Sequence, residues 1–75
     1  MAIEIIEQDG RAILEARVTV YADNANRAAM LAEGELSRHC RKTDTVAAVT
    51  QYKVASKLHV AGGWQYELVF GEFSR

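Results

Sequence analysis

A strand pattern changes to a helix pattern within the segment ARVTVYADNANRAAMLAEGEL, residues 16–36. Valine and threonine alternate in its first part, as they do in a half-buried strand. Asp23 and Asn24 follow, and either side chain can cap a helix by accepting a hydrogen bond from a free amide of the first turn. We therefore expect a strand that leads directly into a helix.

The expected helix runs from Ala25 to about Arg41. Its apolar positions recur every three or four residues and are mostly alanine: Ala25, Ala28, Ala29, Ala32, Leu36 and Cys40. Because such small side chains let a helix axis lie close to a sheet, we expect the helix to pack across the strands. Met30 and Gly34 fall on the opposite side, where Gly34 costs about 1 kcal/mol relative to alanine without an obvious folding reason.

A hairpin is predicted before the helix. Asp9-Gly10 suits the positive φ angles of a two-residue type I′ turn. The matching register pairs residues whose numbers sum to 19. It places Ile3 and Ile5 on an apolar face and puts Ile6 opposite Ile13 on the other face.

The second half of the chain reads as strand again, over Thr45–Val54 and Trp64–Phe73, with Gly62-Gly63 as the turn. A simple two-residue turn there mixes the two faces, so residues 55–61 must contain a bulge or form a loop. Four residues of one parity are expected to fill the core under the helix: Trp64, Tyr66, Leu68 and Phe70. The prediction is one α+β domain over residues 1–75, a ββαββ fold with a four-stranded, mainly antiparallel sheet and one helix packed across one face.

Composition excludes several classes of protein. A chain of 75 residues has room for one core, and 9 basic against 10 acidic residues argues against disorder and against a general polyanion binder. One cysteine cannot close an intrachain disulfide. The apolar runs are far shorter than the roughly 20 residues that span a bilayer, and MAIEIIEQDG lacks the basic start of a signal peptide. We expect a cytoplasmic protein that does not associate with membranes.

No motif predicts catalysis or metal binding. His39 and Cys40 are adjacent, but neighbouring side chains on a helix diverge by about 100 degrees and cannot act together as base and nucleophile. One cysteine with His39 and His59 makes no recognised metal-ligand spacing, and the glycines match no phosphate-binding loop. We therefore predict no enzyme activity, no catalytic residues, no metal site and no cofactor.

The outward side of the expected helix is basic, because Arg27, Arg38 and Arg41 gather there around Met30. One interpretation is structural, since the helix dipole favours basic residues in a last turn. The functional interpretation is a surface for an anion or an acidic partner, nucleic acid included. Against nucleic acid, no strand interleaves basic and aromatic residues as an RNA-stacking sheet does.

The second face of the sheet has no helix to cover it. Five apolar residues are expected there: Ile6, Ile13, Tyr21, Val69 and Phe73. Exposed apolar patches commonly mark contact with a protein partner or a ligand, the alternative being scattered surface residues. We therefore predict a protein-binding module that also self-associates as a dimer or a higher oligomer.

Two resemblances bear on function. The segment LEARVTVYADNANRAAMLAEGEL, residues 14–36, is similar in pattern to small phage-encoded inhibitors, anti-CRISPR proteins among them. Many of these are single domains with a sheet and one helix, and they act by blocking a surface. This resemblance implies an inhibitor of a host protein.

Residues 16–36 followed by YELVFGEF also resemble the strand–helix–strand–strand order of dodecins, small flavin-binding proteins that form hollow dodecamers. That implies a small-molecule-binding homo-oligomer as the alternative function. Dodecins stack flavin on a tryptophan where this chain has Val46-Ala47-Ala48, which is why no cofactor is expected. A nucleic-acid-binding protein is the third alternative.

Overall fold

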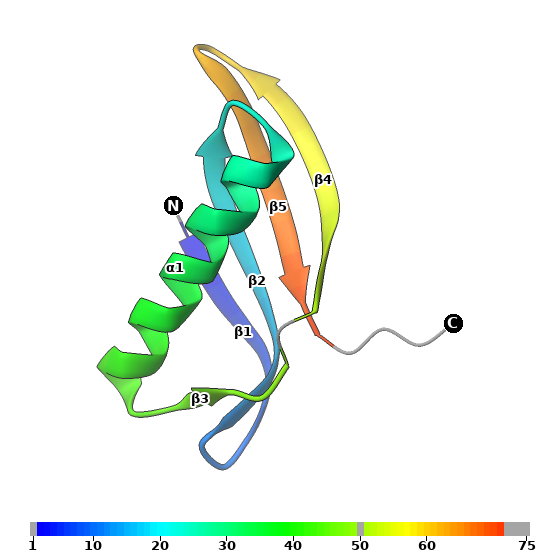
Figure 1. Ribbon diagram of the computed structural model, residues 1–75. Helices are drawn as coiled ribbons and strands as arrows, with labels where there is room; N and C mark the ends of the chain where they lie inside the picture. Colours follow the sequence, from blue (N-terminus) through cyan, green and yellow to red (C-terminus); the bar gives the residue numbers. More distant parts are fainter. Residues whose placement is uncertain (1, 50, 72–75) are drawn as a thin grey trace.

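A computed structural model describes residues 2–49 and 51–71. Its elements, in chain order, are β1 (Ala2–Asp9), β2 (Ala12–Ala22), α1 (Ala25–Thr43), β3 (Val46–Ala47), β4 (Tyr52–Val60) and β5 (Gly63–Phe70). The sheet has the order β1-β2-β5-β4 with antiparallel neighbours, and α1 lies across one face (Figure 1). The predicted α+β fold is confirmed, with one strand more than expected, because the short β3 pairs in parallel with the start of β2.

The first hairpin turns one residue later than predicted, at Gly10-Arg11. Only Gly10 of the two has a positive φ, +61°, as in a type II′ turn with glycine first, whereas the expected type I′ turn needs it at both positions. Paired residues therefore sum to 21 over most of the hairpin. A shift of two leaves the faces unchanged, so Ile3 and Ile5 still pack against the core as predicted.

Two bulges in this hairpin overturn the prediction for Ile13. Ile6 is an extra residue in β1, and Leu14 is an extra residue in β2. Each bulge shifts the alternation of side chains by one residue, and together they restore the register beyond them. Ile13 consequently lies in the core, 2% exposed, and not on the uncovered face of the sheet.

The helix begins after Asn24, whose Oδ1 accepts a hydrogen bond of 2.9 Å from the backbone N–H of Arg27. It ends at Asp44, which has left-handed backbone angles and donates its N–H to the carbonyl of Cys40. The predicted apolar stripe is buried from Ala28 to Cys40, whereas Ala25 is exposed. Because this stripe is mostly alanine, α1 packs closely on β2, with smaller contacts to β3 and β5.

The second hairpin settles the two alternatives for residues 55–61. They form strand with a bulge, because Ala55 is an extra residue between Val54 and Ser56, and the chain turns at Ala61-Gly62. The single strand expected over residues 45–54 is instead β3 followed by the start of β4. Of the four residues expected to fill the core, Tyr66, Leu68 and Phe70 are buried. Trp64 is partly buried and packs against the core.

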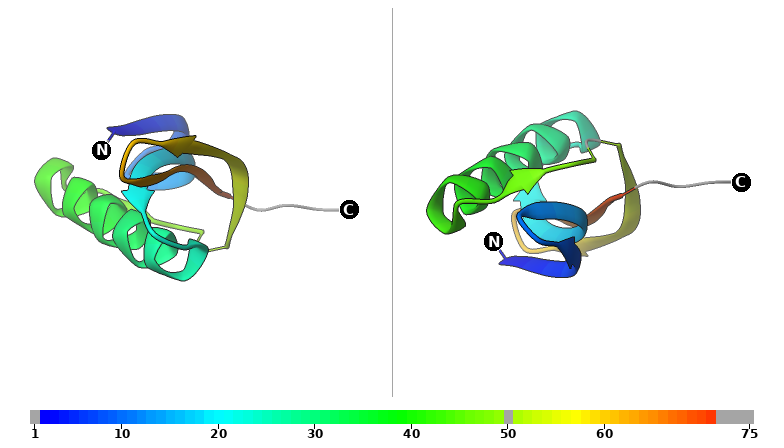
Figure 2. Two further views of the ribbon diagram at one scale, coloured as in Figure 1. Left: turned by 90° about the horizontal axis from the view of Figure 1, so that it is seen from above. Right: turned by 90° about the horizontal axis from the view of Figure 1, so that it is seen from below.

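The helix covers one side of a curved sheet, and the other side has no second layer (Figure 2). At one edge of the sheet, every residue of β4 except Val60 is exposed. No helix in the described part of the chain is long and apolar enough to span a membrane.

Candidate interaction surfaces

The sheet face opposite α1 has a charged centre. Arg17 lies between two carboxylates, with 3.1 Å from Nε to Oε2 of Glu67 and 3.4 Å from Nη1 to Oε1 of Glu4. Ser56 Oγ donates a hydrogen bond of 3.0 Å to Oε1 of Glu67. These contacts join all four long strands, so the middle of this face is polar and not apolar.

The five residues predicted for that face do not form one patch. Ile6 and Tyr21 are exposed, but Ile6 is the bulged residue of β1. Tyr21 lies roughly 20 Å away, near the far end of β2. Val69 is on this face, opposite Arg17, yet it is only 7% exposed. Ile13 is in the core, and Phe73 lies outside the described residues. The prediction is therefore wrong for Ile13, and the other described residues do not form a continuous apolar patch.

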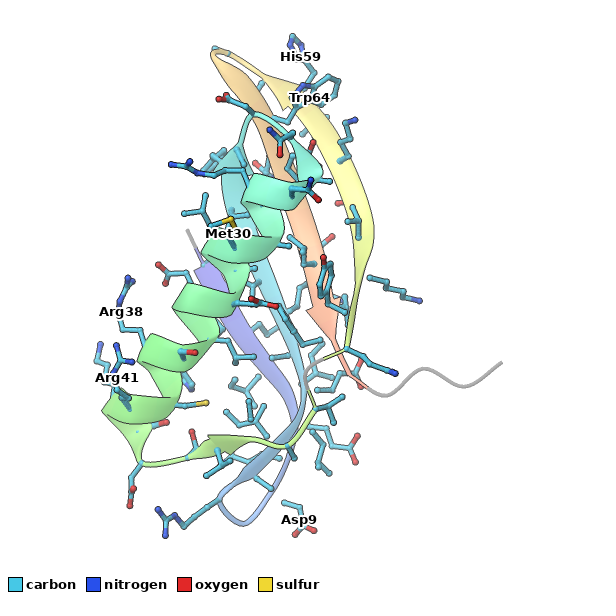
Figure 3. All side chains as sticks on the ribbon, in the orientation of Figure 1. Asp9, Met30, Arg38, Arg41, His59 and Trp64 are labelled. Atoms are coloured by element: carbon cyan, nitrogen blue, oxygen red, sulfur yellow. The ribbon has the colours of Figure 1, made fainter. Side chains whose placement is uncertain are left out.

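The outward face of α1 consists of Arg27, Met30, Gly34, Arg38 and Arg41, all on the side of the helix opposite the buried alanines. Met30 is 68% exposed, the largest exposed fraction among the large hydrophobic side chains described. Arg38 and Arg41 project from α1 away from β4 and β5 (Figure 3). The structure thus brings together all four residues that the sequence predicted for this surface.

The charge on this face is only partly neutralised. Arg38 Nη1 lies 2.6 Å from Oε2 of Glu35, one turn away on the same helix. Among the described residues, Arg27 and Arg41 have no carboxylate within ion-pair distance. Within the part of the chain that the structure describes, the guanidinium groups of Arg27 and Arg41 thus have no acidic partner, and they lie on either side of Met30 along the helix.

Gly34 lies between Met30 and Arg38 and makes a flat position in the middle of the outward face. A Cβ built on Gly34 meets no atom within 4 Å, so packing does not require glycine there. Its φ is not in the left-handed region either. The glycine leaves the helix backbone open to close approach by another molecule.

A hollow of about 290 Å³ lies beside α1, and sequence analysis did not predict it. Its lining combines the helix, β5 and the segment around β3: Glu33, Leu36, Ser37, Ala47, Val49 and Phe70. The ring of Tyr52 on β4 packs against Phe70, with 5.5 Å between centroids. No local motif encodes this hollow, because its lining comes from segments far apart in the chain.

The tip of the β4–β5 hairpin carries a cluster of two aromatic rings and a lysine. The rings of His59 and Trp64 meet edge to face with 4.7 Å between centroids, and Lys57 Nζ lies 4.5 Å from the Trp64 ring. Figure 3 shows His59 and Trp64 together at this end of the molecule. The Trp64 ring thus makes an aromatic contact and a cation–π contact within its own chain. Its three members come together through the hairpin register, which the simple turn did not predict.

The groups considered for chemistry remain apart. Cys40 is buried at the end of the apolar stripe, whereas the adjacent His39 is partly exposed. Within residues 2–49 and 51–71, no three side chains among His, Cys, Asp and Glu come close enough to hold a metal ion.

Comparisons with models of protein families, with curated proteins and with solved structures found no match to this chain. Function is therefore inferred from the surfaces themselves, and the outward face of α1 is the one that both the sequence pattern and the structure bring together.

Proposed function

We propose that this protein is a non-enzymatic module that binds an acidic protein partner through the outward face of α1. The observation that supports the proposal is the position of Arg27, Arg38 and Arg41 around the exposed Met30, opposite the buried side of the helix. Protein interfaces commonly combine an apolar centre with charged flanks. A methionine suits such a centre because its unbranched side chain adapts to irregular surfaces.

The dimensions of this face suit a protein partner. Arg27 and Arg41 are 14 residues apart, which is about 21 Å along a helix. A stable interface buries about 800 Å² on each partner. The outward face of α1 therefore forms the centre of the interface, and neighbouring surface supplies the rest. At Gly34 a partner side chain can reach the helix backbone without meeting a Cβ.

The positive charge of the outward face of α1 indicates that the partner carries acidic groups. Because Arg27 and Arg41 form no ion pair with any carboxylate in residues 2–49 and 51–71, complementary carboxylates on the partner gain charge-assisted hydrogen bonds with them. Such charges steer the encounter of the two molecules, so association slows as ionic strength rises. A module of this kind acts by covering its partner's surface, as the resemblance to small phage-encoded inhibitors implies.

Crosslinking in cells of the source organism tests the proposal. A photoreactive amino acid at position 30 is expected to capture one defined protein, and R27E/R41E is expected to reduce that capture strongly. The control places the same amino acid at Leu58, which is exposed on β4 of the opposite sheet face. Equal capture from both positions, or capture that ignores the charge reversal, contradicts the proposal.

Nucleic acid is the second candidate, because a basic helix face also suits phosphate groups. Against it, Glu33 and Glu35 lie on the same helix and the net charge of the chain is −1. Fluorescence anisotropy with labelled duplex DNA and with single-stranded RNA separates the two. Binding that R27E/R41E abolishes and that collapses with added salt would replace the protein partner by nucleic acid.

A further inference from the structure

The two edges of the sheet carry opposite charge. The strand order makes β1 and β4 the edges, with 8 and 9 residues. β1 holds Glu4, Glu7 and Asp9 and no basic residue, whereas β4 holds Lys53, Lys57 and His59 and no acidic one. Each edge thus repels a copy of itself and attracts a copy of the other.

Each edge strand also contains one bulge, at Ile6 in β1 and at Ala55 in β4. A bulge on an edge ordinarily obstructs the addition of another strand, because it shifts the alternation of side chains by one residue. Two bulges at matching positions cancel this shift. The β1–β2 hairpin is an example, since Ile6 and Leu14 cancel and the register recovers beyond them.

One antiparallel register brings the two edge bulges together, namely the one in which paired residue numbers sum to 60. It places Lys53 opposite Glu7 and Ser56 opposite Glu4. The intrachain partners place all four on the sheet face away from α1. The bulges then fall side by side at the centre.

The same register also keeps the helix-side residues of the two edges on one face of the continued sheet. Beyond one side of the bulges, Tyr52 is opposite Gln8, and beyond the other side Lys57 is opposite Ile3; all four are on the helix side. In the middle, Val54 meets Ile6, and both side chains are 42% exposed in the single chain. Pairing therefore covers apolar surface as well as joining Lys53 to Glu7.

We propose that the protein associates head to tail with a second copy of itself, β4 of one copy pairing antiparallel with β1 of the next. Because the two contacting strands differ, the contact is heterologous and leaves a free edge at each end. It therefore produces rows of copies, or a ring if the rotation between copies closes. The helices all lie on one side of the continued sheet, so the outward face of α1 stays open. This proposal is independent of the partner proposed for that face.

Sedimentation velocity over increasing protein concentration provides the test, with the wild type, K53E, E7K and the double variant K53E/E7K. The wild type is expected to associate, and each single variant to associate at least about tenfold more weakly, because like charges then face each other. The double variant restores opposite charges and is expected to associate again. Equimolar K53E and E7K should also associate when mixed, because each edge of one variant then faces an opposite edge of the other.

Two control variants make the same charge changes away from the edges. K42E and E33K lie on α1 and are expected to associate as the wild type does. Lys53 also makes a contact within its own chain. Loss of association in K53E alone could therefore follow from loss of that contact. If association returns when K53E and E7K are mixed, the pairing between copies is supported and both variants are shown to be folded.

Three results would overturn the proposal. They are a wild type that stays monomeric at every concentration, failure of the mixture and of the double variant to restore association, and loss in K53E without any effect of E7K. The last result would mean that Glu7 on β1 does not face Lys53 in the contact. R27E/R41E is expected to leave self-association unchanged. Failure of the proposed partner binding and failure of the proposed self-association can therefore be distinguished.

Discussion

Arg17 on β2 and Glu67 on β5 form an ion pair of 3.1 Å on the sheet face that α1 leaves uncovered. The pair extends to Glu4 on β1 and to Ser56 on β4, so one arginine organises polar contacts across the whole sheet. This arrangement makes the centre of the uncovered face polar and not apolar.

Replacing Arg17 is expected to weaken the fold modestly. R17A leaves Glu67, whose side chain is 30% exposed, without its cation, and a loss of about 1 kcal/mol in unfolding free energy is expected. R38A breaks a single helix pair with Glu35 and should cost no more than about 0.5 kcal/mol. Urea denaturation followed by circular dichroism measures both, and equal losses would contradict the difference expected from the shared Arg17 contacts.

Enlarging Ala32 is expected to disturb the contact between α1 and the sheet. Ala32 is 0% exposed, and its small side chain lets the helix lie close to β2. A32L should lower the unfolding free energy by about 1–3 kcal/mol through overpacking. A25L, at an exposed position of the first turn, is the control and should change it little. Equal stability of the two variants would mean that the helix can move away from the sheet at no cost.

Gly34 is expected to limit the stability of the helix. G34A should raise the unfolding free energy by about 1 kcal/mol, since alanine favours the helix and the added Cβ meets no atom within 4 Å. Thermal and urea unfolding measure the gain. A destabilised G34A would show that the position has a structural demand that its backbone angles and surroundings do not indicate.

The end of the helix allows a comparison at Asp44, the one non-glycine residue with positive φ among those described. Both D44G and D44A lose the contact of 2.7 Å with Arg11, but only alanine keeps a Cβ in the left-handed region. D44G is therefore expected to be more stable than D44A by about 1 kcal/mol. Urea denaturation of the two variants checks this, and a more stable D44A would contradict it.

Local patterns predicted the elements of this fold well. The alanine spacing and the cap residues placed α1 within two residues of its observed end, and Asn24 acts as the cap. The alternation in the last strand predicted the burial of Tyr66 and Leu68. The basic side of the helix was equally visible, because residues three and four apart on a helix share a face whatever surrounds them.

The pairing of strands was less predictable. Asp9-Gly10 is a sound turn signal, yet the chain turns at Gly10-Arg11, and two bulges move Ile13 from the predicted surface into the core. The predicted apolar face failed for the same reason, and the sequence indicated neither the hollow beside Leu36 nor the contact between Trp64 and Lys57. Each depends on which residues of distant strands lie side by side.

Taken alone, the sequence specified one small α+β fold, a helix with a buried alanine stripe and a basic outward face, and an acidic first strand. These properties follow from residues a few positions apart, where helix and strand periodicity act directly. Only the tertiary structure decided the registers, the bulges and the charged centre of the uncovered sheet face. A single inserted residue moves every following side chain of a strand to the other face, and the energy that places it comes from the whole packed sheet.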